Sequence, residues 1–154
     1  MNRAWLVVTA AALLVVLSGC GSKGAGSGGS ASGTNSGGTP GSKYDAGPRA
    51  ADTPSDPARA ELGKKLFSTK GCTACHAIGR KLTCPDLAGV SRRRTALWME
   101  NQILHPDVMT KEDPIAHELL AKFALQMPNQ GLTPDEARAV VEYFKHKDQE
   151  AGGK

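Results

Sequence analysis

Hydrophobic residues are distributed unevenly along this chain of 154 residues. An almost unbroken apolar run extends from Trp5 to Leu17, and Arg3 places a positive charge just before it. A basic start followed by such a run is typical of an export signal. The run has about 13 residues, which is short for a membrane-spanning helix of roughly 20. We therefore predict an exported chain.

The run ends at Leu17-Ser18-Gly19-Cys20. This resembles the lipobox of bacterial lipoproteins, which implies a signal peptide over residues 1–19 and a lipid on Cys20. Acyl chains would anchor the chain stably, because each buried methylene contributes about 0.8 kcal/mol. We expect a position on the periplasmic or extracytoplasmic side of a bacterial membrane, and Gly21, in place of an acidic residue, favours the outer one. A plain secretory signal and a short uncleaved anchor are the alternatives.

Residues 21 to about 55 consist mainly of Gly, Ser, Ala, Thr and Pro. Such a segment cannot bury enough apolar surface to offset the entropy lost on ordering. We therefore predict that residues 20–55 are a lipidated cysteine and a flexible tether. About 35 residues of Gly-rich coil have an r.m.s. reach on the order of 30–35 Å.

The remaining pattern, over residues 56–148, predicts one all-α domain. A first helix starts at Asp56-Pro57, and a last one starts at Thr133-Pro134 with an apolar residue at every third or fourth position. Shorter helices are predicted from about residue 95 to 104 and from residue 113 onward, with a loop over residues 106–109. No alternating β-branched run suggests a sheet, and residues 149–154 read as a disordered tail.

Charge gives no sign of a nucleic-acid partner. Residues 57–148 hold 14 Lys plus Arg against 11 Asp plus Glu, a net +3, and the whole chain has a formal charge of +4. Arg92-Arg93-Arg94 is the only dense basic run, and no aromatic residues alternate with it as single-strand binding would require.

A domain this small is also marginal in stability without a cofactor or crosslink.

The segment Cys72-Thr73-Ala74-Cys75-His76 carries the clearest chemical signal. Two thiols three positions apart, followed directly by an imidazole, are the attachment pattern of a c-type haem. The thiols can each bond a vinyl group of one porphyrin, and His76 then lies where it can bind the iron. The alternative is half of a zinc site, but a second Cys-x-x-Cys or His pair is missing.

With these motifs the domain resembles a class I mono-haem cytochrome c over about residues 57 to 147. The likeness includes Gly63-Lys64-Lys65-Leu66-Phe67, the haem motif, the loop 85–90, Met127-Pro128-Asn129 and the closing helix. It implies a small helical domain wrapped around one covalently bound haem. It also implies that Gly63 faces Tyr143 or Phe144 where the end helices cross. The Pro85 carbonyl is expected to bind His76, although the family usually has Gly where this chain has Cys84.

The second axial ligand has five candidates: Met99, Met109, Met127, His105 and His117. The resemblance implies Met127, which precedes Pro128 just upstream of the last helix. Met109 is the second choice, Met99 is expected in the core, and the two histidines are expected to face solvent. We therefore expect His76 and Met127 to bind the iron.

Four further side chains are expected near the haem propionates by the same resemblance: Arg92, Arg93, Arg94 and Trp98. A guanidinium can bind a carboxylate bidentately, although an arginine in a charge run can equally be solvated. Cys84 is left without an assigned partner. It is either a small buried residue beside the haem or a metal-binding or redox-sensing thiol.

A haem with both axial sites filled by protein can exchange one electron with little rearrangement. We therefore expect a monomeric electron carrier of a respiratory chain, not an enzyme, that meets redox partner proteins at the membrane. A gas sensor or enzyme with an open sixth site, a structural lipoprotein, and a dedicated donor to a reductase such as a copper enzyme remain alternatives. The first predicts a high-spin haem that binds carbon monoxide tightly when reduced.

Overall fold

The two longest helices begin at the caps that the sequence predicts. A computed structural model describes residues 41–153, so the predicted signal peptide, Cys20 and the first part of the tether lie outside the described residues. Helix α1 (Pro57–Thr69) follows Asp56, whose carboxylate accepts hydrogen bonds from the first free N–H groups of the helix. Helix α6 (Pro134–Gly152) starts with a capping box between Thr133 and Glu136.

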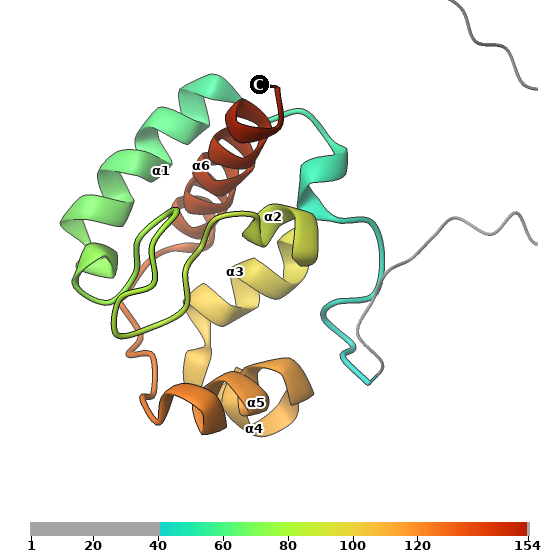
Figure 1. The fold of residues 1–154 in the computed structure, drawn as a ribbon, viewed down its shortest axis with the longest axis vertical. Helices are drawn as coiled ribbons and strands as arrows, with labels where there is room; N and C mark the ends of the chain where they lie inside the picture. The colour runs from blue at the N-terminus through green and yellow to red at the C-terminus, as the bar shows by residue number, and fades with distance from the viewer. Residues whose placement is uncertain (1–40, 154) are drawn as a thin grey trace, which may run out of the picture. The chain divides into compact units, whose positions relative to one another are not determined.

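Shorter helices connect these two (Figure 1). They are α2 (Val90–Arg93), α3 (Ala96–Leu104), α4 (Pro106–Glu112) and α5 (Pro114–Phe123), with 3-10 turns η1 (Ala50–Asp52) and η2 (Cys72–Ala74). The prediction of a loop over residues 106–109 was wrong, because Pro106 is the first residue of α4, a position that needs no N–H donor. Among residues 41–153 there is no strand, and the all-α prediction is confirmed.

Helices α1 and α6 pack side by side at Gly63 (Figure 1). A Cβ at Gly63 would lie only 1.9 Å from the Ala139 carbonyl oxygen, so the glycine allows the two backbones to meet. The atoms nearest to that position belong to Ala139 and Val140 of α6. The rings of Tyr143 and Phe144 both pack on Phe67, each with a centroid distance of 5.7 Å.

The segment before α1 is not a free tether over its whole predicted length. Residues 42–53 pack on the helical domain, and Ser42, Asp45 and Ala50 are buried there. Polar contacts hold this segment: the Asp45 carboxylate accepts hydrogen bonds from Arg49 and from the Thr95 N–H. Composition alone does not reveal such long-range contacts, which explains why the predicted boundary at residue 55 was too late.

The predicted tail is also shorter than expected, because α6 continues through Gly152. The Gln149 side chain accepts a hydrogen bond from the Ser55 N–H and donates one to the Thr53 carbonyl. These contacts tie the last turns of α6 to the segment before α1. None of the helices between residues 41 and 153 combines the length and apolar character needed to cross a membrane.

Candidate haem site

A largely apolar cavity lies between α1, the loop after it, α3, α5 and α6. Its walls surround about 1220 Å³ of space, part of which opens to solvent. Its walls include side chains far apart in the sequence, such as Phe67, Ile103, Leu119 and Leu132. The fold therefore builds one cavity from almost the whole domain.

The two motif cysteines and His76 are held on one tight turn. Gly71 has a φ of 78°, a left-handed conformation that favours glycine, and turns the chain out of α1 into η2. The N–H groups of Cys75 and His76 both reach the Cys72 carbonyl, at 3.2 and 3.0 Å. Cys72 and His76 line the cavity, and burial raises the pKa of the Cys72 thiol.

The imidazole of His76 is oriented by a backbone carbonyl. Its Nδ1 lies 2.9 Å from the Pro85 oxygen, the contact that the resemblance implies. A donor N–H on Nδ1 leaves Nε2 as the nitrogen with a free lone pair, as a metal ligand requires. His76 and Pro85 both line the cavity, so this nitrogen is available to an iron bound there.

The loop that carries Pro85 is organised by Asp86. The Asp86 carboxylate accepts hydrogen bonds from the Gly79 N–H at 2.8 Å and the Ala88 N–H at 2.9 Å. The bond from Ala88 is the main reason that the pKa of Asp86 lies below its ordinary value. The Leu87 N–H also bonds the Ala77 carbonyl at 3.0 Å. Together these contacts fix the loop that presents the Pro85 carbonyl.

The cavity reduces the five candidates for the second axial ligand to two. Met127 and Met99 line it, whereas Met109 does not and is buried in the core with 1% exposure. His105 and His117 are both exposed and lie outside the lining, as expected. Met99 is also a core residue of α3, whereas Met127 lies in the irregular segment between α5 and α6.

One polar residue beside Met127 was not predicted from the sequence. The amide Nε2 of Gln102 lies 3.9 Å from the Met127 sulfur. Its Oε1 is buried and has no hydrogen-bond partner among the described residues. Gln102 lines the cavity from α3. Its place beside Met127 depends on a tertiary contact, and nothing in the local sequence of α3 marks it.

The structure places three of the four predicted propionate contacts in the cavity wall and one outside it. Arg93 and Arg94 line the cavity, whereas Arg92 does not and donates to the Asp148 carbonyl instead. Trp98 lines the cavity with its ring, but its indole N–H donates to the Asp113 carboxylate at 2.9 Å. Arg93 and Arg94 are therefore the members of this group placed to meet an anionic ligand.

Cys84 is a buried free thiol in the wall of the cavity, with 6% exposure. Burial, and secondarily the nearby Cys75, raise the pKa of its thiol. Among the described residues other than glycine, only Ala124 has a positive φ, so Cys84 adopts an ordinary backbone conformation. The glycine that the resembling family usually has there is not required for this turn.

Comparison with known proteins agrees with this site. The sequence profile of the cytochrome c family, described as "Cytochrome c", matches residues 60–148, more than half of the chain. The chain belongs to the cytochrome c family. It is 48% identical over 33 residues to cytochrome c-551 of Azotobacter vinelandii, which covers 21% of this chain and 40% of the relative. The chain thus spans less than half the length of that curated relative.

Solved structures extend the likeness to the fold. A cytochrome c from Rhodothermus marinus is 32% identical, with a TM-score of 0.60, over 62% of this chain and 81% of that one. An engineered form of it is similar, with 31% identity, a TM-score of 0.59, and coverage of 61% of this chain and 81% of that one. The part of the chain that these comparisons cover therefore has the all-α cytochrome c fold.

Members of the cytochrome c family transfer electrons and carry covalently bound haem c with iron, and this chain takes the same cofactor. The donor set fits it: two thiols and an imidazole lie on one turn, and the imidazole is already oriented by Pro85. The apolar walls suit the porphyrin, and the guanidinium groups of Arg93 and Arg94 suit its carboxylates.

Proposed function

We propose that this cytochrome c is a one-electron carrier whose haem iron is bound by His76 and Met127. The observation that carries the proposal is that one cavity is lined by both an imidazole oriented by Pro85 and a methionine sulfur. With His76 and Met127 both bound, the iron would have no coordination site for a substrate. The bound haem would supply the reversible one-electron chemistry.

The protein's own contribution is to hold both ligands in place. Cys72 and Cys75 would bond the porphyrin edge, and His76 would present Nε2 because Nδ1 is bound to Pro85. Met127 would present its sulfur with the Gln102 amide beside it. With haem bound, the apolar walls would leave few polar groups to reorient when the charge of the site changes.

Arg93 and Arg94 are the proposed partners of the haem propionates. Both line the cavity, and the Arg94 guanidinium also lies over the Trp98 ring, 5.3 Å from its centroid. A cation beside a carboxylate favours its ionised form and forms strong hydrogen bonds with it. Arg92 is left out of this proposal because it does not line the cavity.

We further propose that the carrier works at a bacterial membrane in a respiratory chain. The support is the apolar run to Leu17, the Leu17-Ser18-Gly19-Cys20 sequence and the Gly- and Ser-rich segment that follows. A lipid on Cys20 would hold the domain on the periplasmic or extracytoplasmic side, with the outer membrane favoured by Gly21. Its partners would be other redox proteins that it meets there transiently.

Redox-dependent spectroscopy of the haem-loaded protein tests the carrier function. We expect covalently retained haem, a low-spin spectrum in both oxidation states, and oxidation and reduction by one electron with full recovery. The reduced protein should bind little carbon monoxide, because both axial positions are filled. A high-spin spectrum with tight carbon monoxide binding would instead support a gas sensor or an enzyme with an open sixth site.

A further inference from the structure

A buried carboxylate lies in the segment that precedes the matched family region. Asp45 belongs to residues 42–53, upstream of the match at residues 60–148, and its side chain is 0% exposed. A fully buried carboxylate is costly unless it is paired and hydrogen-bonded. The contacts of Asp45 therefore show what this segment is built to hold.

Asp45 binds two arginines and one backbone N–H. Arg49 Nη1 lies 3.0 Å from both of its carboxylate oxygens, and Arg94 Nη1 lies 3.3 Å from Oδ2. The Thr95 N–H donates to Oδ1 at 2.8 Å. Arg49 belongs to the same segment, whereas Arg94 and Thr95 connect α2 with α3. The carboxylate thus connects residues 42–53 with the link between α2 and α3, where the cavity-lining Arg94 lies.

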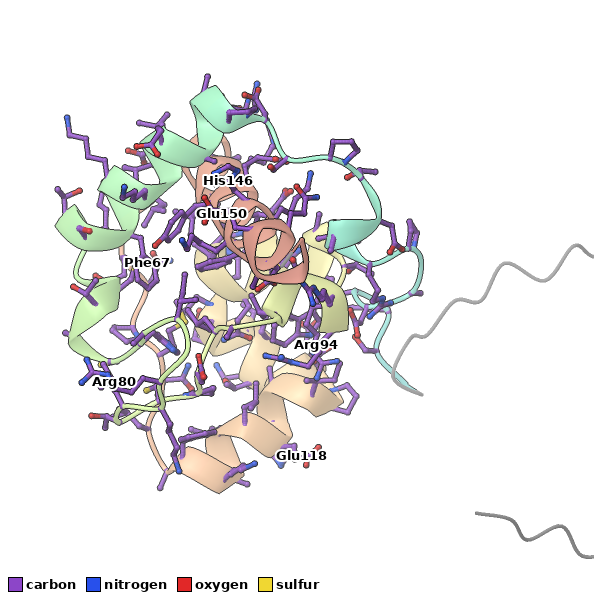
Figure 2. The ribbon with its side chains drawn as sticks, turned by 45° about the horizontal axis from the view of Figure 1, so that its top comes forward. Phe67, Arg80, Arg94, Glu118, His146 and Glu150 are labelled. Carbon is purple, nitrogen blue, oxygen red and sulfur yellow. The ribbon has the colours of Figure 1, made fainter. Side chains whose placement is uncertain are left out.

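The same segment also holds the backbone around Arg94, whose side chain is labelled in Figure 2. The Ala50 N–H donates to the Arg94 carbonyl at 3.0 Å, and the Thr95 hydroxyl donates to the Tyr44 carbonyl at 2.7 Å. Arg49 Nη1 also donates to the Arg93 carbonyl at 2.8 Å. Both cavity-lining arginines are therefore attached to residues 42–53 through their backbones, and Arg94 is attached through its side chain as well.

Ser42 is linked to Trp98, another residue of the cavity wall, through Asp113. Its hydroxyl donates to the Asp113 carboxylate, which is buried and also accepts the indole N–H of Trp98. Trp98 is the ring over which the Arg94 guanidinium lies. Residues 42–53 therefore bind the Arg94 guanidinium directly through Asp45. They are also connected to the Trp98 ring, through Ser42 and Asp113.

We propose that Asp45 is a positioning residue that holds Arg94 at the haem, so that residues 42–53 are part of the redox site. The inference rests on the proposed carrier function, in which Arg94 faces a propionate. A cation held beside the haem disfavours the more positive oxidised iron, and so raises the reduction potential. If Asp45 acts by position, its loss lets Arg94 move toward solvent and lowers the potential.

The sign of the shift separates this role from a simple charge effect. Removing a nearby negative charge by itself favours the reduced iron and raises the potential. Asp45→Ala is therefore expected to lower the potential, in the same direction as Arg94→Gln, although it removes an anion. Asp52→Ala is the matched control, because exposed Asp52 lies on the same segment and accepts only the Arg49 backbone N–H in the contacts described.

The experiment is a spectroelectrochemical titration of the full haem-loaded chain and of four variants: Asp45→Ala, Arg94→Gln, the double variant and Asp52→Ala. We expect Asp45→Ala and Arg94→Gln each to lower the reduction potential. The double variant should have the same potential as Arg94→Gln within error. Asp52→Ala should match the wild type. Asp45→Asn is read in the same way if Asp45→Ala does not retain haem.

Three results would overturn the inference: a raised or unchanged potential in the Asp45 variant, an equal drop whether or not Arg94 is present, or an unchanged potential in Arg94→Gln. The absorption spectra keep the two proposals apart. A low-spin spectrum in every variant with no shift in potential rejects the role of Asp45 alone, whereas a high-spin wild type rejects the carrier function itself.

Discussion

At the scale of single residues, the site depends on a few backbone carbonyls and carboxylates that orient the functional side chains. His76 is aimed by the Pro85 oxygen, 2.9 Å from Nδ1. The loop that presents Pro85 is in turn held by Asp86, through the N–H groups of Gly79 and Ala88. Ligand geometry in this protein therefore depends on residues that do not touch the iron.

Asp86→Asn tests this arrangement through the pH dependence of stability. The pKa of Asp86 is lowered in the folded protein, so the unfolded chain binds the proton more tightly. Its stabilising contribution is present above its ordinary pKa of about 4 and is lost as pH falls through the lower folded pKa. Asp86→Asn should therefore lose less stability between neutral and acid pH, measured by denaturant unfolding at several pH values.

The control for that series is Glu118→Gln, which removes an exposed carboxylate on α5 outside the loop. Its loss of stability toward acid pH should match that of the wild type. If the free energy of unfolding of Asp86→Asn falls toward acid pH as steeply as that of the wild type, the Asp86 carboxylate does not organise the loop.

Gly63→Ala tests the contact between the end helices. The new Cβ would lie 1.9 Å from the Ala139 carbonyl oxygen, which is backbone and cannot rotate away. The helices must then move apart, and overpacking of this kind typically costs about 1–3 kcal/mol. We expect denaturant titrations to show a free energy of unfolding that is lower by about 1–3 kcal/mol.

Gly153→Ala is the matched control, because its Cβ would lie at an ordinary 3.6 Å from the Gln149 carbonyl oxygen. It should change stability by less than about 0.5 kcal/mol, the usual range for a surface substitution. Equal losses in the two variants would show that close backbone approach is not what Gly63 provides.

At the scale of elements, helix ends were predictable where a local cap marks them. The Asp56 and Thr133 caps gave the starts of α1 and α6, because N-cap hydrogen bonds are made within three residues. Helix α4 was missed because Pro106 reads equally as a loop residue or as a first helical residue. Residues 42–53 were missed because Asp45 is held by Arg94 and Thr95, about 50 positions away.

The same distinction applies to the site. Cys72, Cys75 and His76 lie within five residues and could be identified from the sequence alone. Sequence reasoning left Arg92, Arg93 and Arg94 equivalent, whereas the structure places only the last two in the cavity wall. It missed Gln102, whose proximity to Met127 arises only when α3 and the segment before α6 come together.

Thr133→Ala tests the contribution of the α6 cap. The Thr133 hydroxyl accepts the Glu136 N–H, and the Glu136 carboxylate accepts the Thr133 N–H. Loss of such a cap typically costs about 1 kcal/mol, so the midpoint of denaturant unfolding should fall accordingly. Thr83→Ala, at an exposed loop position, should leave the midpoint unchanged, and an unchanged Thr133 variant would show that the capping box contributes nothing.

At the scale of the whole molecule, the chain is proposed to combine a membrane anchor, a linking segment and a haem domain. The apolar run, Cys20 and residues up to 40 lie outside the described residues, so anchoring stays a prediction from the sequence. Residues 42–53 pack on the haem domain and hold Arg94. In the proposed arrangement, residues 42–53 belong to the redox site and not to a tether.

Cys20→Ser tests the anchor. A lipid on this cysteine would place the wild-type protein in the detergent phase of a two-phase extraction, and the variant would leave that phase. Mass spectrometry of the mature N-terminus should also find acyl groups on Cys20 in the wild type. A wild-type N-terminus without acyl groups would contradict the lipoprotein prediction and leave the haem site unaffected.

The most direct test of the central claim is the far-red absorption band that arises from sulfur-to-iron charge transfer in the oxidised, haem-loaded protein. Met127→Leu is compared with Met99→Leu, the other methionine in the cavity wall. The account predicts that the wild type and Met99→Leu show the band, and that Met127→Leu loses it and binds carbon monoxide when reduced. Retention of the band in Met127→Leu, or its loss in Met99→Leu alone, would contradict ligation by Met127.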